Sequence, residues 1–121
     1  MGTLTEPRHA GGYLVSEANG SRSRESVIFA AGHAVPAGAV LGRVTATGKY
    51  VPVSPAAEDG SEKAAGISHA AVDATDADAP GVITARDAEV NAAELEWPTG
   101  TTTQQIADAL AELAEAGIIA R

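Results

Sequence analysis

The sequence predicts a mainly β fold: one small domain of short strands, with a single helix near its C-terminal end and a flexible N-terminal arm. Three observations support this prediction. The chain has 121 residues, a length that suits one domain. Its apolar residues occur in short runs, rich in Val and Ile and interrupted by Gly and Pro, which is typical of strands joined by turns. Near the C-terminal end, apolar residues recur at helical spacing.

Residues 1–25 differ in composition from the rest of the chain. They are rich in Gly, Ser and Arg, with a short apolar island at Tyr13, Leu14 and Val15. Terminal segments of this kind are usually mobile unless a partner holds them. Two interpretations stay open. The segment is either a disordered leader or an arm in which the island adds a strand to the sheet edge of a partner.

Residues 26–121 are expected to form the β domain. Thr47-Gly48 supplies the turn of a hairpin, because it separates two short β-rich runs. Turn or loop chemistry covers residues 32–38 around a proline, the polar stretch 54–63 and the acidic stretch 73–80. The expected strands cover residues 27–30, 40–44, 50–53, 64–72, 82–85 and 89–91.

The helix is the best-marked element. Thr101 or Thr102 can act as its N-cap, because a glutamine follows each of them three residues later, which is capping-box spacing. Gly117 suits the left-handed position after the helix, and the apolar residues 118–119 are expected to fold back on the core. The apolar residues along one helix face are Ile106, Leu110 and Leu113.

Charge and composition exclude several classes of function. Lys and Arg total 8 against 16 Asp and Glu, which gives a formal charge of -8. Nucleic acids and anionic membranes attract clustered cations, so neither is an expected partner. The most apolar stretch, residues 27–42, is broken by His33, Pro36 and several glycines and is too short to span a bilayer, so a soluble protein is expected. The sequence has 0 cysteines, which excludes disulfides and thiolate metal sites.

Two motifs resemble phosphate or metal sites without meeting their requirements. Between Gly42 and Gly48 there are five residues where a phosphate-binding P-loop has four, so a hairpin turn is predicted instead. The aspartates of residues 76–87 match several positions of a calcium loop, but Pro80 takes a ligand position and the flanks are not helical. The residues at calcium-loop spacing are Asp76, Asp78, Gly81 and Asp87.

No catalytic constellation is predicted. His9, His33 and His69 are far apart in the sequence and are expected to be surface or turn histidines. The carboxylate pair Glu58-Asp59 lies in a loop without the apolar surroundings that would raise one pKa for acid–base catalysis. We therefore expect no enzymatic activity, no metal, no cofactor and no small-molecule substrate.

The order of several segments is similar to that of the lambda-type bacteriophage head decoration proteins. The resemblance covers about residues 26–121. It includes the hairpin 40–50, its continuation 52–60, the strand at 65–67 leading to an acidic, alanine-rich loop, the strand 89–98 ending in Trp97-Pro98, and the helix followed by Gly117.

The resemblance implies a small β-clip-like domain that assembles as a homotrimer on the outside of the expanded icosahedral head, after synthesis in the host cytoplasm. It implies a phage major capsid protein as partner, stabilisation of the head against internal DNA pressure, and an arm that extends a sheet of the coat protein. Tyr13, Leu14 and Val15 are then the capsid-binding part of the arm. An aromatic content of only 3% agrees with a small core that gains from oligomerisation.

Trp97 and Pro98 are expected to anchor the core or a subunit interface, and a ligand-stacking role for Trp97 is the alternative. Other classes of function also stay open. Trimeric β-clip folds include small-ligand binding modules and dUTPase-like nucleotide hydrolases, and fold alone does not distinguish them. An interaction module unrelated to capsids is a third possibility. A hydrolase would need magnesium-binding carboxylates and a glycine-rich phosphate loop, which the sequence does not place convincingly.

Overall fold

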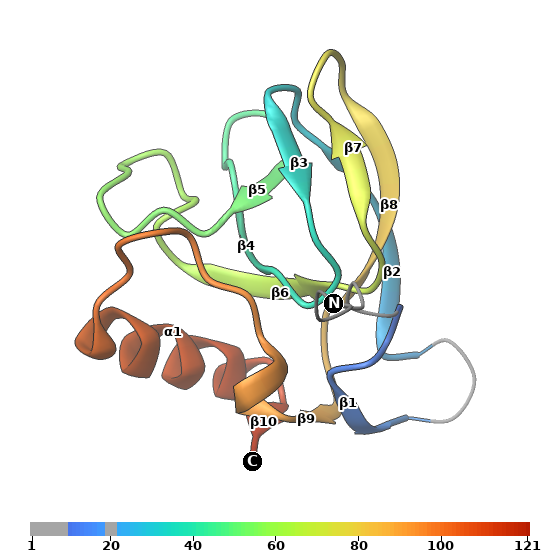
Figure 1. Cartoon of the computed structure of the whole chain (residues 1–121), viewed down its shortest axis with the longest axis vertical. Helices are drawn as coiled ribbons and strands as arrows, with labels where there is room; N and C mark the ends of the chain where they lie inside the picture. Colours follow the sequence, from blue (N-terminus) through green and yellow to red (C-terminus); the bar gives the residue numbers. More distant parts are fainter. Residues whose placement is uncertain (1–9, 19–21) are drawn as a thin grey trace, which may run out of the picture.

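The computed structural model describes residues 10–18 and 22–121, and confirms a mainly β fold with one C-terminal helix (Figure 1). The described residues form ten strands, one short 3-10 helix and one α-helix. These elements are β1 (Leu14–Glu17), β2 (Arg24–Phe29), β3 (His33–Val35), β4 (Val40–Arg43), β5 (Tyr50–Pro52), β6 (Ala64–Ser68), β7 (Val72–Ala74), β8 (Ala79–Thr84), β9 (Ala88–Val90), η1 (Ala92–Glu94), α1 (Thr103–Glu115) and β10 (Ile118–Ala120).

Five strands close a barrel in the order β2-β5-β4-β6-β8. The longest pairing joins β2 to β8 antiparallel, from Arg24 opposite Thr84 to Phe29 opposite Ala79. The ring of Phe29 is fully buried inside this barrel. Gly81 of β8 makes room for it, because a Cβ at that position would lie 2.6 Å from Phe29 Cε1.

A second core lies between the barrel and the C-terminal elements. Strands β1, β9 and β10 form a small sheet in the order β1-β9-β10, and α1 packs against β6 and β10 (Figure 1). Leu113 of α1 and Ile118 of β10 are each 1% exposed in this core, beside Val90 and Tyr13. The predicted return of the chain onto the core is confirmed for Ile118, since β10 pairs parallel with β9. It is wrong for Ile119, which is 40% exposed because successive side chains of a strand point to opposite faces.

The helix boundaries follow the predicted signals. Thr102 is the N-cap: its hydroxyl accepts from the backbone N–H of Gln105, and the Gln105 side chain accepts from the N–H of Thr102. Gly117 has a φ of 83°, the left-handed conformation that favours glycine after a helix. The predicted hairpin is also confirmed, with β4 and β5 antiparallel and Gly48 at a φ of 73° in the turn.

Two stretches predicted as turn or loop contain strands. β3 lies within residues 32–38, and β7 lies at the start of the acidic stretch 73–80, while β8 begins before its end. β3 and β7 pair antiparallel, with Ala34 opposite Asp73. These stretches contain many turn residues, yet pairing with a distant segment makes part of each a strand, because strand formation depends strongly on tertiary context.

The segment 89–98 is not one strand. β9 ends at Val90, and Asn91 begins η1 by accepting a hydrogen bond of 3.0 Å from the N–H of Ala93. The chain then rejoins the sheet region only through a bridge between Glu96 and Ala39. A local cap therefore interrupts what the sequence resemblance indicated as a continuous strand.

Candidate functional site

The apolar island of the N-terminal segment is anchored in the fold. Tyr13 is 2% exposed, and its hydroxyl lies 2.5 Å from Oγ1 of the fully buried Thr84. Burial raises the pKa of Tyr13 to about 12. The half-buried Leu14 packs against the same core. The structure therefore adds what neither sequence-based interpretation of this segment included, because the island is held by its own chain.

The partner strand is β9. Leu14 lies opposite Val90 and Glu17 opposite Ala88, with an irregularity between Leu14 and Ser16. Since β2 also begins at Arg24, the folded part of the chain includes residues that the sequence assigned to the arm 1–25. Residues 1–9 and 19–21, among them His9, lie outside the described residues.

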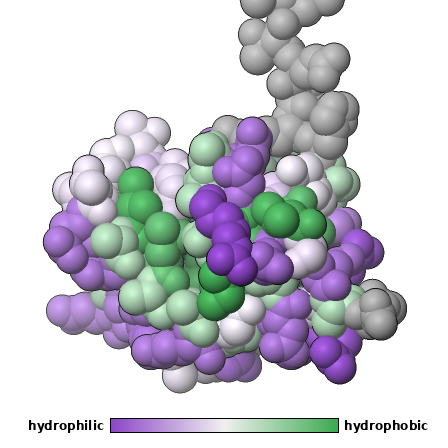
Figure 2. Space-filling model, turned by 90° about the horizontal axis from the view of Figure 1, so that it is seen from below, coloured by the Kyte–Doolittle hydropathy of each residue, from purple (hydrophilic) through white to green (hydrophobic). Residues whose placement is uncertain are grey.

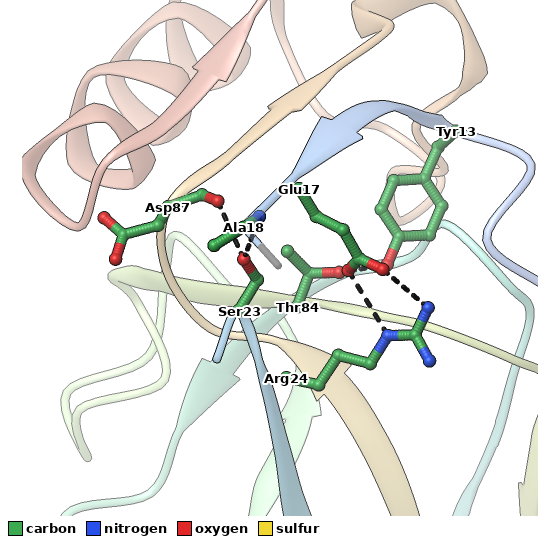
Figure 3. Close-up of polar contacts among 7 residues, drawn as sticks. All are labelled: Tyr13, Glu17, Ala18, Ser23, Arg24, Thr84 and Asp87. Carbon is green, nitrogen blue, oxygen red and sulfur yellow. Dashed lines mark hydrogen bonds and ion pairs between the residues drawn. The ribbon is translucent and has the colours of Figure 1, made fainter. Parts of the chain in front are cut away.

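A polar clasp holds the end of β1 to the start of β2 (Figure 3). The hydroxyl of the fully buried Ser23 donates to the carbonyl of Asp87 at 2.8 Å and accepts from the N–H of Ala18 at 2.9 Å. Beside it, the Arg24 guanidinium donates to both carboxylate oxygens of Glu17, at 2.7 and 3.2 Å. The two hydrogen bonds of the Ser23 hydroxyl to the backbone, together with the bidentate ion pair of Arg24 and Glu17, therefore hold the end of β1 in place.

The outer face of this small sheet carries exposed apolar side chains. Val15 of β1 is 58% exposed and Ile119 of β10 is 40% exposed. Glu89 of β9 lies in the sheet between these strands and accepts hydrogen bonds from Arg121 at 2.5 Å and from Ser16 at 3.1 Å. The bond from Arg121, and then that from Ser16, lowers the pKa of Glu89. Figure 2 views the molecule from this end, where green apolar areas lie around strongly hydrophilic ones.

This face ends in an open strand edge. β9 lies between β1 and β10, so β1 pairs on one side only among the described residues. An unpaired strand edge offers main-chain donors and acceptors to a further strand. We refer below to β1, β9 and β10 with the exposed Val15 and Ile119 as the basal sheet.

Trp97 lies away from the basal sheet, on a groove of about 420 Å³. The residue is half-buried and packs against the core cluster of α1 and β6, so the structure places it between core and surface. Pro98, next to it, also lines the groove. On its other side Trp97 lines a hollow of about 240 Å³ together with Glu62, Asp108 and Glu112.

The remaining candidate residues are dispersed. His33 lies on the rim of the Trp97 groove, whereas His69 packs under Gly11, and a Cβ at Gly11 would lie 2.9 Å from His69 Cε1. Asp78, from the calcium-like spacing, bonds Lys49 at 2.5 Å. Over residues 10–18 and 22–121, no group of three or more His, Asp or Glu side chains could hold a metal ion. In the same residues, no helix has the length and hydropathy to cross a membrane.

Comparison with known proteins agrees with the resemblance noted in the sequence. A family model described as "Bacteriophage lambda head decoration protein D" matches residues 3–118. A comparison with curated proteins returned no match. The family match covers the barrel, β1 and β9, and ends at Ile118, the first residue of β10.

Proposed function

Since the chain belongs to the bacteriophage lambda head decoration protein D family, we propose that it binds the outside of the expanded phage head as a homotrimer and stabilises the head against internal DNA pressure. A structural role in the phage capsid follows from the family itself. The family match is the observation that carries the proposal, and the basal sheet is the surface that we assign to the major capsid protein.

The fixed position of β1 supports this assignment. Tyr13 and the Ser23 clasp hold the strand on the barrel, so its free edge is preformed and little backbone entropy is lost when a coat-protein strand pairs with it. Val15 points outward and supplies an apolar contact, whereas Tyr13 is the anchor rather than a contact. Leu14, half-buried, supports the strand from below.

The arm proposed from the sequence is thereby divided into two parts. Tyr13 is the buried anchor, and Leu14 and Val15 belong to the anchored strand β1. Directly before this anchor, the N–H of Gly11 donates to the carbonyl of His69 at 2.8 Å, so residues 10–12 belong to the fold as well. We propose that residues 2–9 pair or wrap on the coat protein next to β1, where three copies in one trimer raise each other's effective concentration. A net charge of -8 on each copy keeps free trimers apart before they meet the shell.

The experiment that tests this function is a binding assay with expanded heads formed from the cognate major capsid protein. Wild-type protein should co-sediment with expanded heads, bind unexpanded heads much less, and raise the temperature at which DNA-filled heads burst. Loss of binding after deletion of residues 2–9, with unchanged melting of the free protein, would support the arm.

Two substitutions on the basal sheet and one control substitution on α1 test the basal sheet separately. Val15→Lys and Ile119→Asp place a charge on the proposed contact face, whereas Ala111→Asp places one on the exposed side of α1. The first two should weaken binding to expanded heads about tenfold or more, and Ala111→Asp should not. Full occupancy by Val15→Lys and Ile119→Asp would exclude the basal sheet as the docking surface.

A further inference from the structure

Away from the basal sheet, the outer face of the β2–β8 pair presents an exposed apolar ridge. Ile28 lies opposite Pro80, and Ser26 lies opposite Val82, so these four side chains share one face of the ribbon. Ile28 is 43% exposed and Val82 is 37% exposed. Their neighbours along the strands, such as Phe29 and Ile83, point into the barrel and are fully buried. We call the four outward residues the β2–β8 ridge.

The second apolar surface is the Trp97 groove. It is floored by Val40 and Val53, which are buried, and is bordered mainly by uncharged side chains. Its titratable members are His33 and Glu96. Its uncharged exposed or half-buried lining residues are Ala34, Pro36, Pro52, Ser54, Trp97, Pro98 and Thr99.

We propose that the β2–β8 ridge of one copy of this chain occupies the Trp97 groove of the next copy, and that this contact, repeated, closes the trimer. The inference rests on the proposed homotrimer and names the surfaces that form it. A ring of three needs a heterologous contact, in which each copy offers two different patches, because an isologous contact joins only two copies. The ridge and the groove are two such patches on different elements.

The distribution of carboxylates favours the Trp97 groove over the smaller hollow beside Trp97 as the contact between copies. Each copy carries a charge of -8, so two copies approach with least repulsion where both surfaces are poor in carboxylates. Glu62, Asp108 and Glu112 line the hollow next to α1, which would place three carboxylates against a second acidic chain. The four ridge residues are uncharged, and Glu96 is the single carboxylate of the groove lining.

The position of the two patches agrees with a second copy as occupant. In Figure 1 the basal sheet lies at the lower end, while β2 and β8 rise along one side and β3 and β5 lie in the upper half. With the basal sheet on the shell, the strands that carry the ridge and the strands β3 and β5 beside the groove rise away from the shell. Apolar side chains that stay exposed on a free monomer are buried by this contact.

Cross-linking tests the contact directly, because the chain has 0 cysteines and gives a clean background. Val82→Cys labels the ridge, Ala34→Cys labels the groove, and Ala111→Cys on α1 is the matched control. After treatment with a short bifunctional maleimide at micromolar concentration, the double variant Val82→Cys/Ala34→Cys should form covalent trimers. An equal mixture of the two single variants should form covalent dimers, and each single variant and Ala111→Cys should stay uncross-linked.

Two further readouts separate this inference from the proposed function. Sedimentation equilibrium reports whether trimers exist at all, and head binding reports the capsid role. Val82→Asp should raise the concentration at which half of the trimers dissociate about tenfold or more, with an unchanged circular dichroism spectrum, while Ala111→Asp should not.

Trimers that persist without ridge–groove cross-links, or that cross-link equally through Val82→Cys alone, would overturn the contact and leave the capsid role standing. A protein that is monomeric at every concentration would overturn both the free trimer and this contact.

Discussion

The hydroxyl of Tyr13 and Oγ1 of Thr84 lie 2.5 Å apart in the interior, where they join the residue before β1 to the last residue of β8. Both residues are almost fully buried, at 2% and 0% exposure. The contact lies between the barrel core and the basal sheet, so it determines where the free edge of β1 stands relative to the barrel. Four predictions concern the groups around this contact and the Trp97 groove.

Tyr13→Phe should destabilise the protein by about 1–3 kcal/mol, because it leaves the buried hydroxyl of Thr84 without its partner. Urea unfolding followed by circular dichroism measures the change. Tyr13→Phe/Thr84→Val removes both partners, so its loss should be smaller than the sum of the two single losses. Strict additivity of the two substitutions would show that the bond contributes no coupling energy.

Stability should fall at alkaline pH through Tyr13. Its pKa is raised from 10.0 to about 12 by burial, so the folded state favours the neutral phenol. That contribution is present below about pH 10 and is lost as the pH rises through about 12. The free energy of unfolding should therefore decrease above about pH 10, and less so in Tyr13→Phe. Burial also raises the pKa of Tyr50, which is present in both proteins and therefore adds the same slope to each.

Mild acid should destabilise the protein through His69. Desolvation, and then the charge of Arg24, lowers the pKa of this imidazole, and Glu17 opposes the shift. Within the described residues its buried Nδ1 has no hydrogen-bond partner. A lowered folded-state pKa means that the contribution to stability is present above about pH 6.5, the ordinary pKa of histidine, and is lost as the pH falls below it through the lowered pKa of the folded state.

Melting temperatures of wild-type protein and His69→Gln between about pH 7 and pH 5 measure this effect. The decline should be shallower in His69→Gln than in the wild-type protein. An equal decline in the two proteins would assign the acid sensitivity to other groups.

Trp97→Ala should destabilise the monomer by about 2 kcal/mol, less than the loss of a fully buried tryptophan, because the ring is half-buried. As the chain has one tryptophan, its emission reports the groove alone. The emission maximum should shift to longer wavelength when the proposed trimers dissociate on dilution. An emission maximum independent of protein concentration, across a dissociation seen by sedimentation, would place Trp97 outside the interface.

The sequence by itself determined the elements whose signals are local. Thr102 with Gln105, and Gly117 with the apolar pair after it, lie within a few residues of the helix ends they specify. The turn at Gly48 likewise depends only on its neighbours, so the hairpin of β4 and β5 was predictable. The mainly β class followed from the spacing of apolar residues, and the family followed from the order of these segments.

Only the tertiary structure decided which strands meet. Nothing near Tyr13 in the sequence indicates that β9 pairs with β1, or that the hydroxyl of Thr84 meets its own. The pairing of β3 with β7 was hidden for the same reason, because each strand is only three residues long and stands beside turn residues, Gly32 and Pro36 for β3 and the acidic stretch 73–80 for β7. A short strand gains most of its stability from the partner beside it, and the partner comes from a distant part of the chain. The basal sheet and the Trp97 groove exist only after those long-range pairs have formed.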